Sequence, residues 1–256
     1  MHIETELLTG NKMSKTVSAP VFKPLYEQIK VFLTQSLIAG EWKPGESIPS
    51  EMELAARFNV SQGTVRKAID ALAMENILIR RQGKGTFVAT HKEEQSKLRF
   101  LRLNSQDGHK EKLENTMLDC KRLKASAEIS QLTGLKNGTA VIEIKRLLTF
   151  SKQPKILDYI IVQSKFFRGL TAPKISEHNG SLYSMYETLY GIPMVRAEEK
   201  LTAVSASPEQ AALLNVKPGF PLLRIERVAY TYGDKPMEWR VGLCVTDNHH
   251  YLNELE

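Results

Sequence analysis

Two helix starts close together in residues 50–72 constrain the fold of this chain more than any other feature. Ser50 is followed three residues later by Glu53, the capping-box pattern in which each side chain satisfies a backbone N–H at the start of a helix. Ser61 begins a second helix, whose apolar residues recur at helical spacing at Val65, Ala68, Ile69 and Leu72. The pattern predicts two short helices that meet across a tight turn.

A further helix and a hairpin flank this pair. Apolar residues on one stripe predict a helix from Leu25, for which Pro24 suits the first turn and Gly40 the end. After the pair, β-prone runs at 77–80 and 85–88 are joined by a basic tip that contains glycine, which is typical of a hairpin. The predicted order is three helices followed by this hairpin, or wing.

The remaining residues predict a second domain. The 256 residues exceed the roughly 100–200 of one typical domain, and the polar, charged run 89–98 is typical of a linker. Beyond it, strand-like and helical runs alternate between turns, which predicts an α+β fold with mostly antiparallel strands. The predicted strands are 140–150, 156–163, 194–204, 221–232 and 236–246, and the predicted helices are 127–132, 181–190 and 208–214. The predicted divisions are a flexible N-terminus (1–20), a first domain (21–90), a linker (91–98) and a second domain (99–256).

Composition excludes several classes of protein. With 42% hydrophobic and 25% charged residues, the chain is neither disordered nor fibrous. Cys120 and Cys244 are its only cysteines and lie outside any CxxC spacing, so neither a disulfide framework nor a cysteine-based zinc site is expected. No run is apolar enough to span a membrane and no signal peptide precedes the fold, so we expect a cytoplasmic protein with no membrane partner. The net charge of +6 permits a nucleic-acid partner without identifying one.

Residues at the start of the second short helix have the chemistry of DNA recognition. In a helix-turn-helix the N-terminus of this helix faces base edges and phosphates. Ser61 and Thr64 can bind phosphates, Gln62 can pair with an adenine edge, and Arg66 can contact a phosphate. The predicted DNA-binding residues are Ser50, Ser61, Gln62, Gly63, Thr64, Arg66, Arg81, Gln82, Gly83, Lys84, Gly85 and Thr86. Two alternatives stay open: a hairpin that contacts protein, and an Arg66 that pairs with Asp70 one helical turn later.

Residues 24–88 resemble the N-terminal winged-helix domain of the GntR family of bacterial transcription regulators. The resemblance rests on four short motifs: Pro49-Ser50-Glu51, Val60-Ser61, Thr64-Val65-Arg66 and Gly83-Lys84-Gly85. The chain departs from the family at Met52 and Gln62, where many members have arginine. The loss of a guanine-reading arginine at Gln62 shifts the expected base preference toward adenine or weakens it.

Residues 100–252 resemble the effector-binding (UTRA) domain of the HutC subgroup, which is similar in fold to chorismate lyase. This resemblance implies a winged helix-turn-helix followed by an antiparallel-sheet domain that binds a small molecule. Arg146 matches a family arginine that often meets an anionic part of the effector, Asp158 matches a strand acid, and Glu238 matches an acid on the last hairpin. Further candidates lie beside them. The full predicted effector-binding set is Arg146, Asp158, Ser164, Lys165, Tyr230, Glu238 and Arg240.

These effector residues suit a small polar anion with additional hydrogen-bond donors, because arginine binds carboxylate or phosphate and a carboxylate accepts from hydroxyls or amines. Leu148 stands where sugar-phosphate-sensing members carry a second arginine, which weakens the case for a phosphosugar. Arg146 could instead pair internally with Asp158 or Glu238. His249 and His250 point to opposite faces of a strand, so we expect no metal site, and no cofactor is expected.

The resemblance therefore implies a ligand-responsive repressor, homodimeric, that binds double-stranded operator DNA and is released by a small polar, anionic metabolite. A homodimer would match a near-palindromic operator. The chain contains no evident nucleophile–base arrangement, so we expect no enzymatic activity. Two rival functions are an enzyme of chorismate-lyase type tethered to DNA, and an architectural DNA-binding protein without an effector.

Overall fold

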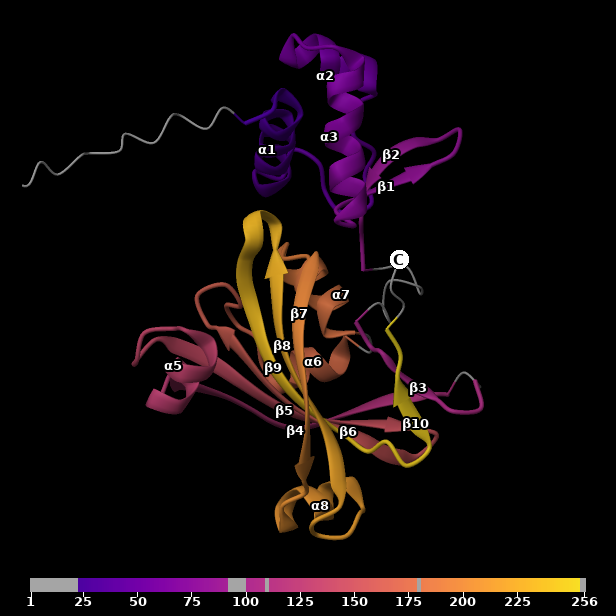
Figure 1. Ribbon diagram of the computed structural model, residues 1–256. Helices are drawn as coiled ribbons and strands as arrows, with labels where there is room; N and C mark the ends of the chain where they lie inside the picture. The colour runs from indigo at the N-terminus through magenta and orange to yellow at the C-terminus, as the bar shows by residue number, and fades with distance from the viewer. Residues whose placement is uncertain (1–22, 92–99, 109–110, 179–180, 254–256) are drawn as a thin grey trace, which may run out of the picture.

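The computed structural model describes residues 23–91, 100–108, 111–178 and 181–253 (Figure 1). The N-terminal part contains three helices followed by a two-stranded hairpin, as predicted. Its elements are α1 (Leu25–Ile38), α2 (Glu51–Phe58), α3 (Gln62–Met74), β1 (Leu78–Arg81) and β2 (Gly85–Val88). The N-terminus predicted to be flexible and nearly all of the predicted linker lie outside the described residues.

Local hydrogen bonds fix both short helices, and both predicted caps are confirmed. The Glu53 amide donates to Ser50 Oγ at 3.3 Å and the Ser50 amide donates to Glu53 Oε2 at 2.8 Å. The Thr64 amide donates to Ser61 Oγ at 3.2 Å, which begins α3. Between the helices, Asn59 ends α2 with a left-handed φ of 51°. These caps determine where α3 begins and so which residues its first turn exposes.

The second part is built on a six-stranded antiparallel sheet with the strand order β4-β5-β6-β9-β8-β7. These strands are β4 (Leu113–Lys124), β5 (Ala140–Phe150), β6 (Gln153–Gln163), β7 (Arg196–Ser205), β8 (Pro221–Thr231) and β9 (Lys235–Cys244). β3 (Leu103–Ser105) pairs with β10 (His249–Tyr251). The remaining elements are α5 (Ala127–Thr133), α6 (Ala172–Glu177), α7 (Leu182–Tyr190), α8 (Pro208–Leu214) and the 3₁₀ turn η1 (Tyr232–Asp234).

The two faces of this sheet have different partners. Side chains alternate along each strand, so Ile160 faces one side and Leu157 the other. The face of Ile160, here called the inner face, packs against Met185 and Tyr186 of α7. The face of Leu157, the outer face, packs against α8, which lies at the lower end of the sheet in Figure 1. The outer face also packs against Ile129 of α5.

Every strand and helix predicted in the second part is present, with boundaries shifted by a few residues. Two substantial elements were not predicted: the edge strand β4 and the short helix α6. β4 is exposed along most of its length, so its sequence lacks the alternation of apolar and polar residues that identifies a half-buried strand. In the described residues no helix is long and apolar enough to cross a membrane.

The two parts touch directly as well as through the chain. Val195 and Tyr232 of the second part are buried in the same apolar cluster as Leu33 and Ile69 of the first. Gly233 lies beside Ile38 at the end of α1, where an added Cβ would be 3.6 Å from the Ile38 Cδ1 atom. The position of the winged helix is therefore set by packing against η1 and the start of β7.

The core of the N-terminal part gives a first prediction. Leu54 of α2 is fully buried, so Leu54→Ala should lower the free energy of unfolding by about 2–5 kcal/mol through lost contacts and a residual cavity. Met52 lies on the same helix and is 71% exposed, so Met52→Ala should change it by less than about 0.5 kcal/mol. Urea unfolding of the full chain, followed by circular dichroism, measures both. Equal losses would contradict the packing described for α2.

Candidate functional site

The first turn of α3 presents polar groups outward. Ser61, Gln62 and Gly63 are exposed and Thr64 is half-buried. The Ser61 and Thr64 hydroxyls lie 2.9 Å apart, so they form one polar unit at the helix N-terminus. A helix N-terminus also attracts anions through its free N–H groups and its dipole. This turn can therefore accept a phosphate and present Gln62 beside it.

A carboxylate that sequence reasoning missed organises the basic side chains nearby. Glu51 of α2 accepts from Arg66 Nε at 2.9 Å and from Arg80 Nη1 at 3.0 Å. Gln62 also donates to Glu51, at 3.3 Å. The hydrogen bond from Arg66 is the largest influence on the pKa of Glu51 and lowers it. Two arginines and a glutamine, from α3 and β1, are thus held by one acid of α2.

The expected alternative partner of Arg66 was wrong. Asp70 lies one turn along α3 from Arg66, but its hydrogen bonds come from Arg80 of β1, at 2.7 and 3.1 Å. The spacing of four residues allowed the Arg66–Asp70 pair, but Glu51 on the neighbouring helix competes successfully for Arg66. The motif Pro49-Ser50-Glu51 predicts a DNA-binding role only for Ser50, whereas the structure adds Glu51 as the partner of Arg66.

The wing tip places its predicted residues at the surface, with one exception. Gln82, Gly83, Lys84 and Gly85 are exposed, and Gly83 and Gly85 take positive φ angles of 70° and 106° that favour glycine. The Arg81 guanidinium lies 4.7 Å from the centre of the Phe87 ring. Thr86 is only 9% exposed, so its side chain faces the core and the prediction that it contacts DNA is corrected. The alternation of side chains along β2 causes this, since Thr86 lies on the same side of the strand as the buried Val88.

Four of the seven predicted effector residues meet in one buried network on the inner face. Arg146 of β5 donates from Nε to Asp158 of β6 at 2.9 Å. Arg240 of β9 lies 3.4 Å from Asp158 and 2.8 Å from Glu238. The Tyr183 hydroxyl of α7 donates to Glu238 at 2.9 Å. Adjacent strands thus bring together charges that are far apart in the sequence.

Burial determines the electrostatics of this network. Asp158 is 3% exposed; burial alone would raise its pKa, but the charges of Arg240 and Arg146 hold that pKa below its ordinary value. Burial lowers the pKa of Arg146 despite its pairing. Burial also raises the pKa of Tyr183 to about 12, so its hydroxyl stays protonated and donates. The network therefore consists of ion pairs in a region with little water.

A second buried ion pair adjoins the first. Arg227 of β8 donates from Nε to Glu199 of β7 at 2.6 Å and also donates to the carbonyl of Phe100. Arg227 and Arg240 occupy paired positions on neighbouring strands, so they lie side by side on the inner face. The sequence did not predict a site role for Arg227, Glu199 or Tyr183. No local pattern distinguishes them, because their partners come from other elements.

The other three predicted effector residues make different contacts. The Tyr230 hydroxyl donates to Glu198 at 2.9 Å and the Arg196 guanidinium lies over the Tyr230 ring. Lys165 lies over the ring of Phe166. The Ser164 hydroxyl is buried and has no hydrogen-bond partner in the described residues. None of the hydrogen bonds found in the described ranges joins these three to the network.

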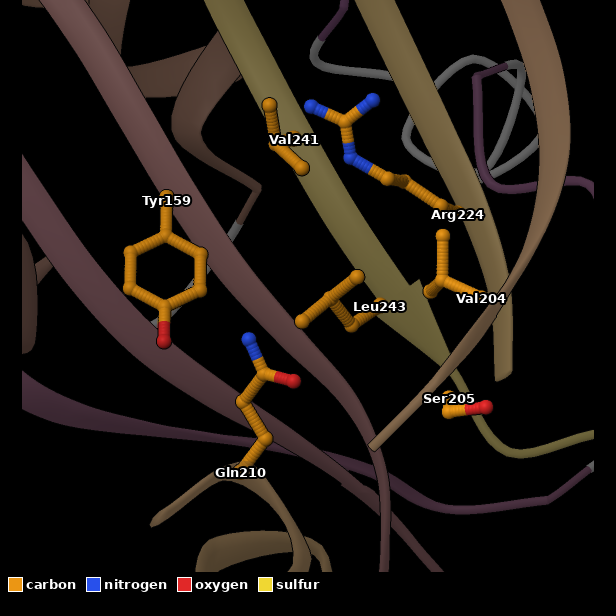
Figure 2. A pocket seen from close by; sticks show the side chains of 7 residues that line it. All are labelled: Tyr159, Val204, Ser205, Gln210, Arg224, Val241 and Leu243. Atoms are coloured by element: carbon orange, nitrogen blue, oxygen red, sulfur yellow. The ribbon is translucent and has the colours of Figure 1, made fainter. Parts of the chain in front are cut away.

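A hollow of about 350 Å³ lies on the other side of the sheet (Figure 2). Its polar lining comes from Tyr159, Ser205, Gln210 and Arg224, and its apolar lining from Val204, Val241 and Leu243. Tyr159 follows Asp158 in the same strand and so points to the outer face, away from the network. The hollow contains none of the predicted effector residues. In the described residues no group of three or more histidine, cysteine or acidic side chains could hold a metal ion.

The start of the predicted linker is fixed to α7. The His91 amide donates to Glu187 Oε2 at 2.9 Å, Thr90 Oγ1 donates to the same carboxylate, and His91 Nε2 lies 2.8 Å from the Met194 carbonyl oxygen. The rings of His91, Phe100 and Tyr183 pack together, with centroids 5.1–6.0 Å apart. One helix therefore holds the chain that leaves the winged helix and also contacts Glu238 through Tyr183.

Comparisons with known proteins agree with both halves. Residues 25–88 match the family of bacterial regulatory proteins named gntR, and residues 109–250 match the UTRA domain. The chain is similar to the HTH-type transcriptional regulator YurK of Bacillus subtilis, at 30% identity over 88% of this chain and 92% of that protein. It is similar to the transcriptional repressor NagR of the same organism, at 27% identity over 91% and 96%. A ligand-binding domain of a GntR-family regulator from Bordetella bronchiseptica covers 62% of this chain and 98% of its own, with 45% identity and a TM-score of 0.59.

The geometry of α3 distinguishes two kinds of contact. Arg66→Ala should weaken binding to all DNA sequences about equally and reduce the salt slope by about 1, because it removes one phosphate contact. Gln62→Ala should mainly relax base preference, because Gln62 can pair with a base edge but carries no charge that would attract phosphate. Fluorescence anisotropy on specific and scrambled duplexes at several salt concentrations measures both, with Lys145→Ala in β5 as a cation control. Unchanged binding by Arg66→Ala would mean that α3 is not the DNA-reading helix.

Proposed function

The chain belongs to the GntR family of bacterial regulatory proteins and carries a UTRA domain, and from this premise we propose how it represses transcription. Regulators of this family bind operator DNA, and UTRA domains bind small-molecule effectors. We assign DNA reading to the first turn of α3 and the wing tip, and effector binding to the ion network on the inner face. The observation that carries the proposal is that α7 contacts both that network and the end of the winged helix.

We propose that α3 enters the major groove with Gln62 toward the bases and Arg66 toward a phosphate. The wing tip would lie against the neighbouring backbone, where Lys84 neutralises phosphate charge. Arg80 joins this surface as a contact not foreseen from the sequence, because Glu51 holds it beside Arg66. A homodimer would present two such surfaces to a near-palindromic operator.

An effector can enter the ion network only if the ion pairs of the network rearrange. Arg146 pairs with Asp158, which is one of the two internal pairings left open by the sequence. An effector that binds there must replace these pairs with pairs of its own, because an unpaired buried charge is costly. The outer-face hollow is less suited to this role, since Arg224 is its one charged side chain and pairs with Glu226.

Coupling between the two sites runs through α7. Tyr183 and Glu187 are four residues apart and so lie on the same side of the helix. Tyr183 bonds to Glu238 in the network, and Glu187 bonds to Thr90 and His91 at the end of the winged helix. An effector that displaces Tyr183 would shift α7 and loosen this attachment. Such coupling requires that the effector bind the two arrangements with different affinity.

The two rival functions fit less well. The members of the family and the similar proteins are transcription regulators, so the hypothesis of an enzyme of chorismate-lyase type is not supported. An architectural DNA-binding protein would have no use for a buried charged network attached to the linker. That network costs stability relative to apolar packing, which favours a ligand-binding role.

Loss of the α7 attachment should be detectable without knowing the effector. Glu187→Ala removes the acceptor for Thr90 and His91, so trypsin should separate the winged helix from the second part at least about fivefold faster, since local opening at His91 becomes easier. Glu209→Ala, at an exposed position of α8, is the matched control and should leave the rate unchanged. Mass spectrometry of timed digests gives the rate. An unaltered rate for Glu187→Ala would exclude this carboxylate as the attachment.

The proposed function is tested by binding of the full chain to DNA from its own genomic neighbourhood. Anisotropy titrations at two salt concentrations should show specific, salt-sensitive binding. One compound from a panel of small polar metabolites should then release the protein. Absence of specific binding under all conditions would overturn the proposal.

A further inference from the structure

We propose that the effector is a zwitterion with no net charge, carrying one anionic group and one ammonium. This inference rests on the proposed function, since it concerns the ligand of the inner-face network. It narrows the expectation of an anionic metabolite to a molecule that supplies both signs of charge. The inner face carries this inference through three observations: its balanced charges, an unpartnered carboxylate oxygen and the aromatic rings that cover it.

Opposite charges are equal in number across the four-residue network and the adjoining Arg227–Glu199 pair. The cations are Arg146, Arg227 and Arg240, and the anions are Asp158, Glu199 and Glu238. All six side chains are at most 13% exposed. Each arginine already has a carboxylate partner, so the described part of the inner face holds no surplus positive charge for a phosphate or a dicarboxylate.

A ligand that enters this network must leave every buried charge paired. An anion without a cation could capture Arg146 only by taking it from Asp158, which would then lie buried with less compensation. A zwitterion exchanges partners one for one. Its anionic group takes an arginine, its ammonium takes the carboxylate that the arginine leaves, and the net charge of the region stays the same.

One carboxylate oxygen of the network, Glu238 Oε2, accepts no hydrogen bond from the described residues. Glu238 is fully buried, and its Oε1 accepts from Tyr183 and Arg240 at 2.9 and 3.0 Å. Its Oε2 has no hydrogen-bond partner in the described residues, and the neighbouring buried Tyr186 hydroxyl, whose pKa burial and the Glu238 charge raise, has none either. A buried carboxylate oxygen normally accepts at least one hydrogen bond, and an ammonium supplies three donors. Glu238 Oε2 therefore marks the position of the ligand's ammonium.

Aromatic rings already hold cations over this site. The Arg240 guanidinium lies 5.3 Å from the centre of the Tyr183 ring, and the Arg227 guanidinium lies 5.8 Å from that of Phe100. A cation is attracted to the face of an aromatic ring, whereas an anion is not. A ligand ammonium that displaces an arginine would therefore keep this contact, while a second anionic group would lose it.

The test compares matched ligands on the unmodified full chain. Isothermal titration calorimetry at neutral pH is run with neutral α-amino acids and dipeptides, with the corresponding acids that lack the amino group, and with hexose 6-phosphates. At least one zwitterion should bind, and its deaminated counterpart should bind about 10- to 100-fold more weakly, since it loses a charged hydrogen bond. Tighter binding by a deaminated acid or a hexose phosphate would overturn the inference, as would binding by no zwitterion.

A charge-neutralising variant gives an independent readout. Glu238→Gln leaves a surplus positive charge on the inner face, so the preference should invert: the zwitterion weakens about tenfold or more and its deaminated counterpart tightens. Glu209→Gln, in an exposed pair on α8, is the control and should preserve the preference. Equal weakening for both ligands would contradict the assigned role of Glu238. If Glu238→Gln does not fold, the comparison on the unmodified chain still decides.

The same titrations separate this inference from the proposed function. If a hexose phosphate releases the protein from its operator, the inference of a zwitterionic effector is wrong and the proposed repressor function stands. A zwitterion that binds in the calorimeter to a chain that recognises no operator would overturn the proposed function and leave the ligand class standing.

Discussion

Charge inside an apolar sheet is tolerated only when it is paired, and this requirement organises the second part of the molecule. Arg146, Asp158, Arg240 and Glu238 come from three strands whose register places them within hydrogen-bond reach. Apolar side chains of the same size would fill this face without the free-energy cost of removing charges from water. The register of β5, β6 and β9 thus keeps a paired, polar site in the middle of the sheet.

The same requirement links this site to the winged helix. Tyr183 satisfies Glu238 from α7, and the next turn of that helix presents Glu187 to the chain leaving the wing. Val195 and Tyr232 add apolar contact between the two parts. A change in the pairing on the inner face thus has a short physical path to the orientation of α3, made of packed side chains and hydrogen bonds.

Sequence reasoning succeeded where the determinants were local. The caps at Ser50 and Ser61 involve residues three apart, and the strand runs of the second part alternate clearly enough to be found. It failed where the determinants were distant in the chain. Glu51 competes with Asp70 for Arg66 from another helix, and Tyr183 reaches Glu238 across 55 residues. Three of the four effector residues that do meet, Arg146, Asp158 and Glu238, were predicted by resemblance. Arg240 was a further candidate, and nothing in the sequence separated it from Ser164, Lys165 and Tyr230.

The edge strand β4 has a consequence for the behaviour of the protein in a crowded cell. It is exposed along most of its twelve residues, and an exposed, regular strand of that length invites other chains to extend the sheet. Its ladder with β5 is interrupted between Met117 and Asp119, and Lys121 and Asp119 carry charge outward. An irregular, charged border is a poor template for further pairing, so the sheet ends at six strands and remains resistant to fibre-like association.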